Sequence, residues 1–327
     1  MRDAFPSPAP IIFPLGGRRV WVAGHTGLVG SALLRRLATE GCEIVVAPRS
    51  ELDLTRQAEV EGWVERVHPE AVFVAGGKVG GIAANDSQPA DFLYDNLMIQ
   101  ANIVEAARRA GAAKVMLLGS SCIYPRLAPQ PIAEDALLTG PLEATNQWYA
   151  ISKIAALRLG QAYRRQFGFD VVSAMPTNLY GPGDNYDPAS SHVLPAMIRK
   201  ACEAAQRCEP SIALWGSGEA RREFLHADDC ADALVFLMKR WSSEEPVNVG
   251  SGEEVSIAEL AEMIAQSAGF SGAILCDRSR PDGTPRKLLD CSRLLALGWR
   301  PRIPLADGIA EAVRRFAAGL EDSCLAA

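Results

Sequence analysis

The feature that most constrains the fold is a turn with regularly spaced glycines between an apolar strand and an amphipathic helix. Residues 18–50 read RRVWVAGHTGLVGSALLRRLATEGCEIVVAPRS, in which Gly24, Gly27 and Gly30 recur at every third position. The β-branched run before them predicts a strand, and the leucine spacing after them predicts a helix. Glycines let backbone N–H groups approach a pyrophosphate, whose charge the helix N-terminus favours. The turn therefore predicts a dinucleotide site, although such glycines also occur in purely structural turns.

The end of the second strand in this unit indicates which dinucleotide binds. The strand ends in APRS and not in Asp or Glu, which NAD would need there for its ribose hydroxyls. Arg49 instead offers a cation to a 2′-phosphate, so the sequence predicts NADP. The alternative is a solvated Arg49 without a ligand. Asp53 is expected to lie under the adenine or to cap a helix.

The rest of the first half continues the alternation of strands and helices. Apolar runs at 71–77, 114–121 and 170–182 predict buried parallel strands, and 90–110 and 147–167 predict helices between them. This order implies an α/β fold with a Rossmann-type, doubly wound parallel sheet. Ligands of such sheets bind at the carboxyl ends of the strands.

Composition excludes several classes of protein. The chain has 327 residues and a net charge of −6, with no dense run of Lys and Arg, which argues against nucleic-acid binding. We found no apolar stretch near the roughly 20 residues that span a bilayer. The eight cysteines include no Cys-x-x-Cys pair, so we expect no metal site and no disulfide framework. The Pro-rich residues 1–16 are expected to form a flexible leader on a cytoplasmic protein.

A Tyr and a Lys four residues apart suggest acid–base chemistry. In NQWYAISK, Tyr149 and Lys153 share one helix face. An ammonium beside a phenol lowers the pKa of the phenol, which can then exchange a proton near neutral pH. Ser120, at the end of a predicted strand, would bond the same substrate oxygen. Cys122 follows it and is either a small buried side chain or an acid–base group.

These motifs resemble those of the extended short-chain dehydrogenases/reductases, and more narrowly those of the GDP-L-fucose synthases. The similarity spans about residues 18 to 316 and includes AGHTGLVGSA, KVGGIAAN, LGSSCIYP, YAISKIA and WGSGEARREFLHADD. It implies NADPH-dependent 3,5-epimerisation and 4-keto reduction of GDP-4-dehydro-6-deoxy-D-mannose to GDP-L-fucose. In the family, the cysteine and histidine that match Cys122 and His192 epimerise C3 and C5, whereas His192 alone would be read as structural.

The resemblance also implies three sets of residues. The catalytic residues would be Tyr149, Lys153, Ser120, Cys122 and His192. The cofactor would be bound by Gly24, His25, Thr26, Gly27, Leu28, Val29, Gly30, Arg49, Asp53, Leu118, Gly119, Ser120, Ser121, Lys153, Pro176, Thr177, Asn178, Leu179 and His192. The GDP half of the substrate would be held by Lys200, Trp215, Arg222, Asp282 and Lys287.

Domain organisation and assembly are further expectations. Residues 17–181 with about 224–250 would form the NADP-binding domain, and about 182–223 with 251–327 a smaller α/β domain for the GDP-sugar. Similar proteins form homodimers through the helices expected at 90–110 and 147–167, so we expect a homodimer.

Rival functions differ at identifiable residues. A 4,6-dehydratase needs Asp-Glu where this chain has Ser121 and Cys122, and a 4-epimerase retains NAD and needs no Cys/His pair. A non-catalytic NADP-binding sensor would have lost Tyr149 or Lys153. A reductase of a GDP-4-keto-6-deoxy sugar without full epimerisation, or of a GDP-sugar lacking the 3-hydroxyl, remains open.

Overall fold

The centre of the molecule is a six-stranded parallel sheet. The computed structural model describes residues 7–280 and 282–325. The strand order is β2-β1-β3-β4-β5-β9, and every neighbouring pair is parallel. The strands are β1 (Arg19–Ala23), β2 (Glu43–Val45), β3 (Ala71–Val74), β4 (Lys114–Leu118), β5 (Asp170–Pro176) and β9 (Val247–Val249). The chain leaves β1 in one direction for β2 and in the other for β3, so the topological switch point lies beside the glycine turn.

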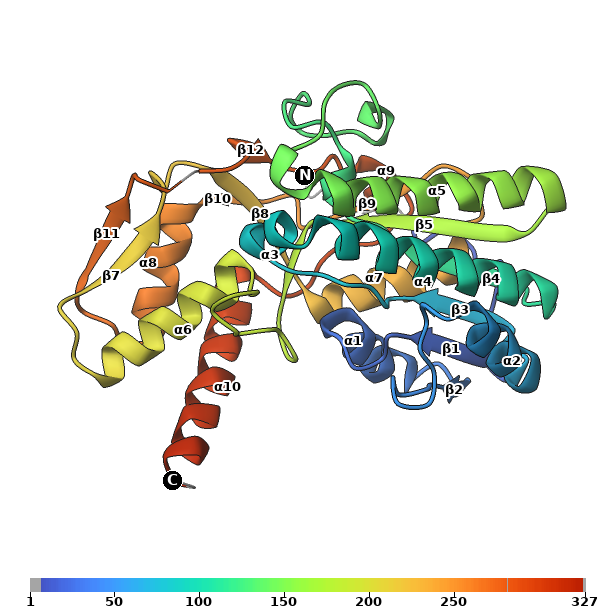
Figure 1. Cartoon of the computed structure of the whole chain (residues 1–327), viewed down its shortest axis with the longest axis horizontal. Coiled ribbons are helices and arrows are strands. Elements are labelled where there is room, and N and C mark those ends of the chain that lie inside the picture. The colour runs from blue at the N-terminus through green and yellow to red at the C-terminus, as the bar shows by residue number, and fades with distance from the viewer. Residues whose placement is uncertain (1–6, 281, 326–327) are drawn as a thin grey trace.

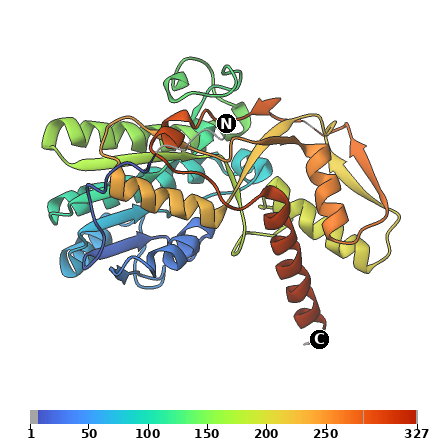
Figure 2. The ribbon, with the colours of Figure 1, turned by 180° about the vertical axis from the view of Figure 1, so that it is seen from behind.

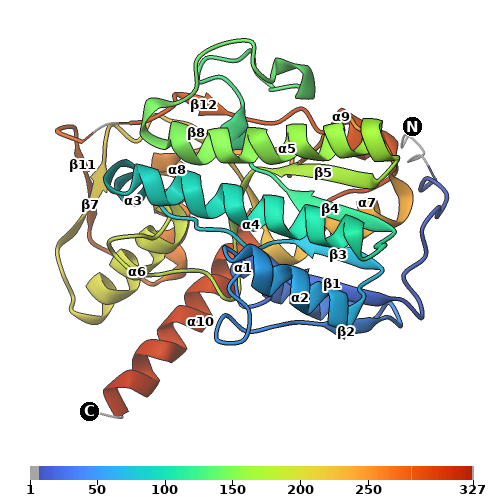
Figure 3. The same cartoon turned by 45° about the vertical axis from the view of Figure 1, so that its right-hand side comes forward.

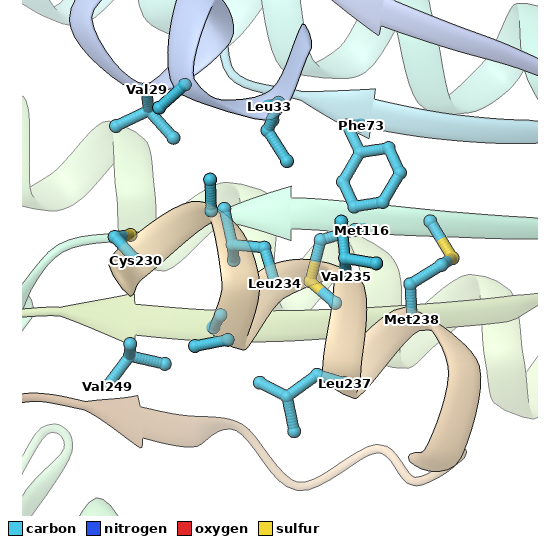
Figure 4. Close-up of a cluster of buried hydrophobic side chains, with 14 of the residues drawn as sticks. Val29, Leu33, Phe73, Met116, Cys230, Leu234, Val235, Leu237, Met238 and Val249 are labelled. Atoms are coloured by element: carbon cyan, nitrogen blue, oxygen red, sulfur yellow. The ribbon is translucent and has the colours of Figure 1, made fainter. Parts of the chain in front are cut away.

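Helices cover both faces of this sheet, which confirms the predicted doubly wound α/β fold (Figure 1). The helices are α1 (Leu28–Leu37) and α7 (Ala227–Arg240) on one face, and α2 (Gln57–Val67), α4 (Pro89–Arg109) and α5 (Gln147–Phe167) on the other. Figure 2 shows α7 lying across its face of the sheet. Figure 4 shows the core there, where Leu33 of α1 and Leu234 of α7 meet Phe73 and Met116 of the sheet. Both faces of β3 are covered, which is why it reads as a continuous apolar run.

A smaller domain carries two further sheets. In one, β8 (Arg221–His226) pairs with β6 (Asn178–Tyr180), β10 (Glu254–Ser256) and β12 (Arg286–Lys287). In the other, β7 (Ser211–Trp215) pairs with β11 (Ala273–Asp277). The helices packed beside these sheets are α6 (Val193–Gln206), α8 (Ile257–Ser267) and α10 (Leu305–Leu325). The short helices α3 (Ile82–Ser87) and α9 (Ser292–Ala296) complete the elements that Figure 1 labels. Residues 281 and 326–327, which the expected small domain includes, lie outside the described residues.

A buried residue, Glu223, forms hydrogen bonds with segments that follow three different strands. Glu223 of β8 is fully buried, and its two oxygens accept hydrogen bonds from the N–H of Gly252 at 2.7 Å and of Leu289 at 3.0 Å. The backbone carbonyl of Glu223 accepts from Thr177 Oγ1 at 3.2 Å and Asn178 Nδ2 at 2.8 Å. Glu223 therefore fixes the loop after β5 against the segment after β12.

The described part of the N-terminal leader is not loose. Ile12 N–H donates to the carbonyl of Lys239 at 2.9 Å, Ala9 N–H donates to the carbonyl of Leu297 at 2.9 Å, and Leu15 is buried in the core with α1 and α7. Residues 9–15 thus lie against the Rossmann domain through these two hydrogen bonds and Leu15, while Ile11 and Ile12 stay 47% and 54% exposed. Residues 1–6 lie outside the described residues.

Within the described ranges, no helix is long and apolar enough to cross a membrane.

Candidate active site

The glycine turn is packed too closely to admit side chains. A Cβ on Gly24, whose φ is +86°, would lie 2.3 Å from the Cα of Gly76, and one on Gly30 would lie 2.0 Å from the carbonyl oxygen of Gly24. This tight packing draws α1 against β1 and leaves open backbone at its N-terminus, where Gly27 provides no side-chain cap. The N–H groups of the first helical turn are therefore available to an anion, as the sequence predicted for a pyrophosphate.

Arg49 and Asp53 lie in the loop after β2. Arg49 is exposed. Asp53 Oδ1 accepts hydrogen bonds from Thr55 N–H at 3.0 Å and Thr55 Oγ1 at 2.8 Å, and these bonds, with the nearby Arg49 charge, lower the pKa of Asp53. The N-cap of α2 is Arg56, so the alternative in which Asp53 caps this helix is wrong.

The ends of β4 and β5 bring two of the predicted cofactor segments together. β4 pairs with β5 up to Leu118 opposite Ala174, and Gly119 N–H then donates to the carbonyl of Ala174 at 2.8 Å. The runs 118–121 and 176–179 therefore leave the sheet side by side at its carboxyl edge.

Ser120, Cys122, Tyr149 and Lys153, which we term the catalytic cluster, meet at this edge. Tyr149 and Lys153 project from α5 and are buried. Lys153 Nζ donates to the carbonyl of Leu118 at 2.8 Å and lies 5.6 Å from the centre of the Tyr149 ring. The Ser120 side chain lies near the Tyr149 hydroxyl and lowers its pKa.

Burial sets the charge states of this cluster. Burial raises the pKa of Tyr149, the charge of Cys122 raises it further, and the Ser120 hydrogen bond lowers it. Burial lowers the pKa of Lys153 to about 8. The expectation that Lys153 depresses the Tyr149 pKa is therefore wrong for the chain on its own, since desolvation outweighs the charge. Tyr149 remains protonated near neutrality, which is the form that donates a proton.

Cys122 has two donors near its sulfur. Asn146 Nδ2 lies 3.3 Å and Lys287 Nζ lies 3.8 Å from Cys122 Sγ. The backbone N–H of Cys122 donates to Ser120 Oγ at 3.2 Å. Among the residues that the structure describes, this contact is the one hydrogen bond of the Lys287 side chain, so Lys287, expected to hold the GDP half, lies beside the thiol.

His192 ends the loop before α6, and a second glycine pair supports that loop. Gly81 N–H donates to the carbonyl of Ser190 at 2.9 Å, and a Cβ on Gly81 would lie 2.6 Å from the Ser191 carbonyl oxygen. The His192 ring is reached by solvent but is surrounded by protein atoms, and this desolvation lowers its pKa. The loop lies near the catalytic cluster, because a Cβ on Gly80 would also lie 3.2 Å from Phe92, whose ring packs edge-on against Tyr149.

Lys200, Trp215, Arg280 and Asp282, which we term the nucleotide cluster, lie on the smaller domain. Trp215 is 55% exposed, with Lys200 Nζ 5.4 Å and Arg280 Cζ 4.9 Å from its ring centre. Asp282 Oδ1 accepts from Ser217 N–H at 2.6 Å. The result is an exposed aromatic face flanked by two cations.

Arg222 lies between the two clusters. Its charge interacts with those of Cys122, Glu143 and Asp282, while burial lowers the pKa of its guanidinium. A half-buried cation between the Cys122 thiol and an exposed aromatic suits a diphosphate.

The sequence analysis missed Asn146 and Arg280. Asn146 directly precedes a helix, where asparagine normally caps, so its pattern gave no reason to expect a side chain at the thiol. Arg280 stands in a loop and is brought to Trp215 by the pairing of β7 with β11.

Comparisons with known proteins agree with this geometry. Residues 20–250 match the NAD dependent epimerase/dehydratase family. A GDP-L-fucose synthase of Sinorhizobium fredii is 55% identical over 312 residues, covering 95% of this chain and 99% of its own. A GDP-L-fucose synthetase from Naegleria fowleri bound to NADP superposes with a TM-score of 0.86 at 28% identity, covering 98% of both chains. A GDP-6-OMe-4-keto-L-xylo-heptose reductase from C. jejuni superposes with a TM-score of 0.88 at 31% identity, covering 95% of this chain and 100% of its own.

Proposed function

The chain belongs to the NAD dependent epimerase/dehydratase family and, within it, to the GDP-L-fucose synthases, and from that premise we propose its reaction. The enzyme epimerises C3 and C5 of GDP-4-dehydro-6-deoxy-D-mannose and reduces C4 with NADPH, which yields GDP-L-fucose. The observation that carries the proposal is the meeting of Cys122 with Ser120, Tyr149 and Lys153 at the carboxyl edge of β4. One site thereby holds groups for both half-reactions.

The residues present fit NADP. The glycine turn offers open backbone to the pyrophosphate, and the exposed Arg49 offers charge to the 2′-phosphate. Bound NADPH would supply a hydride to C4 of the sugar. We assign the remaining contacts to the runs 118–121 and 176–179 and to Lys153 and His192.

Epimerisation uses the acidity that the C4 ketone gives to its neighbours. Cys122, as a thiolate, removes the proton from C3 or C5, and the electron pair moves onto the C4 oxygen as an enolate. His192 returns a proton to the same carbon from the opposite face, which inverts it. Its lowered pKa makes the protonated imidazole a stronger acid.

Reduction uses the phenol. Ser120 and Tyr149 bond the C4 oxygen, and Tyr149 donates its proton as that oxygen becomes a hydroxyl. The Lys153 ammonium compensates the phenolate that is left. We assign the GDP half to Lys200, Trp215, Arg222, Asp282 and Lys287. Lys287 Nζ also lies 3.8 Å from Cys122 Sγ.

A product assay tests the proposal. The protein is incubated with NADPH and GDP-4-dehydro-6-deoxy-D-mannose, and the sugar is identified by NMR. We expect GDP-L-fucose, with deuterium at C3 and C5 when the solvent is heavy water. A reduced sugar with the starting configuration at both carbons would instead identify a reductase without epimerisation, which is the second candidate. The likeness to a heptose reductase favours that candidate, whereas the presence of both Cys122 and His192 favours the first.

We further propose a homodimer in the cytoplasm. Helices α4 and α5 lie side by side (Figure 3) and expose Tyr94 by 61%, Trp148 by 40% and Ile151 by 38%. Such apolar exposure on two adjacent helices suits a four-helix interface with a second copy. The seven cysteines from Cys42 to Cys291 are free thiols, which suits a reducing compartment. Light scattering on the unaltered protein and on Trp148→Glu tests the dimer.

A further inference from the structure

Asn146, the residue that precedes α5, does not make the helix-capping hydrogen bond that is expected of an asparagine at this position. Asn146 occupies the N-cap position of α5, where an asparagine oxygen normally accepts a hydrogen bond from a backbone N–H of the first turn. In α5 the Asn146 side chain makes no such bond. The start of α8 shows the usual arrangement, because Ser256 Oγ accepts from Glu259 N–H at 3.1 Å and the Glu259 carboxylate accepts from Ser256 N–H at 2.7 Å.

The amide of Asn146 instead faces the thiol. Its Nδ2 donates to Cys122 Sγ at 3.3 Å, and its Oδ1 is buried without a hydrogen-bond partner among the described residues. Only its backbone has a structural bond, from Asn146 N–H to the carbonyl of Glu143 at 3.2 Å. The Asn146 side chain therefore makes no hydrogen bond that caps the start of α5.

In the contact between Asn146 and Cys122, the amide nitrogen is the donor and the sulfur is the acceptor. An amide nitrogen only donates, so the sulfur is the acceptor, and the second neighbour, Lys287 Nζ, also only donates. Hydrogen bonds of this kind are stronger when the acceptor is charged. Asn146 also precedes Tyr149 by three residues, which places the amide and the phenol on one side of α5. A single helix thus sets the thiol and the proton donor relative to each other.

We propose that Asn146 is a positioning residue that gives up its helix cap to hold the Cys122 sulfur for proton transfer at C3 and C5. The inference rests on the proposed function and assigns a residue to its epimerisation half. Reduction at C4 relies on Ser120, Tyr149 and Lys153 and does not need the amide.

The test uses substitutions that restore the cap while removing the donor. Asn146→Ser and Asn146→Asp both place a good capping oxygen before α5 and neither reproduces the amide N–H at the sulfur. We expect each variant to unfold at the same or a higher temperature than the unaltered protein and to bind NADPH equally well. Exchange of deuterium from heavy water into C3 and C5 should fall at least about tenfold, because a hydrogen bond to a charged group is lost. Gln147→Ala, which alters the next residue, is the matched control and should exchange normally.

A second measurement needs no sugar. Iodoacetamide alkylation of Cys122, followed by mass spectrometry of its peptide, should slow about tenfold in Asn146→Ser and stay unchanged in Gln147→Ala. Normal exchange and normal alkylation in Asn146→Ser would overturn the proposal. A lower unfolding temperature accompanied by weaker NADPH binding would also overturn it, since the side chain would then be structural. If the unaltered protein exchanges no deuterium, the proposed function fails, while the alkylation rates still decide whether Asn146 acts on the thiol.

Discussion

The catalytic cluster and the nucleotide cluster differ in how far their side chains are exposed to solvent. Tyr149 and Lys153 are buried against the main sheet, and burial moves the pKa of both. Trp215 is 55% exposed, and its cations stand over an open ring on a two-stranded sheet. Proton transfer needs groups whose charge state the protein controls, whereas recognition of a nucleotide needs surface that the ligand itself covers. The comparison predicts that changes in the catalytic cluster reduce kcat and that changes at exposed residues weaken binding.

The largest effect should follow from Tyr149→Phe. Loss of the phenol removes the proton donor and should lower kcat by roughly 10²–10⁴-fold, while NADPH binding persists. Steady-state kinetics with fluorescence titration of NADPH measures both. A Phe variant with near-normal kcat would remove Tyr149 from the mechanism. It would also contradict the prediction that changes in the buried catalytic cluster reduce kcat.

Arg49→Ala tests an exposed cation at the cofactor end. Since Arg49 would pair with the 2′-phosphate, its loss should narrow the preference for NADPH over NADH by roughly 10–100-fold. The values of kcat/KM for both cofactors measure this, and kcat with saturating NADPH should change little. Equal use of the two cofactors by the unaltered protein would show that Arg49 has no such role.

Lys153→Met tests the cost of burying a charge. The pKa of Lys153 is lowered to about 8 in the folded chain, from an ordinary value of 10.5. Between those values the unfolded state binds more protons, so the free energy of unfolding contributed by Lys153 rises with pH, by about 2 kcal/mol from pH 7 to pH 9.5. Urea unfolding of both proteins at the two pH values measures the difference, because the other titrating groups cancel. If the free energy of unfolding changes with pH identically in the two proteins, burial does not lower the pKa of Lys153.

Trp215→Ala should have the smallest effect. An exposed aromatic flanked by cations contributes about 1 kcal/mol, so KM for the GDP-sugar should rise about fivefold with kcat unchanged. Trp215→Phe, which keeps a ring, should retain most of the affinity. A fall in kcat in the Ala variant would mean that the nucleotide cluster also orients the sugar and that the two regions are not separable.

The main elements could be predicted from the sequence because local signals specify them. The helix expected at 147–167 is observed at those residues, and β3 and β4 end where glycines follow apolar runs. The residues at the carboxyl ends of β4 and β5 could also be predicted, since parallel topology fixes where those ends meet. The contact of Lys287 with Cys122 could not, because it joins residues 165 positions apart through the pairing of β12 with β8. The raised pKa of Tyr149 depends on burial that no local pattern expresses.

The docking of the leader has a consequence for how this chain is made. Ala9 and Ile12 leave the ribosome long before their backbone partners, Leu297 and Lys239. The sixth strand, β9, also closes the Rossmann sheet only after residue 249 has been added. At translation rates of about 5–20 residues per second, the leader waits roughly 15–60 s for its groove. Throughout that interval Leu15, which is 1% exposed in the folded protein, and the partly buried Phe13 lack the α7 side chains that cover them, so this apolar surface is exposed to other chains during synthesis.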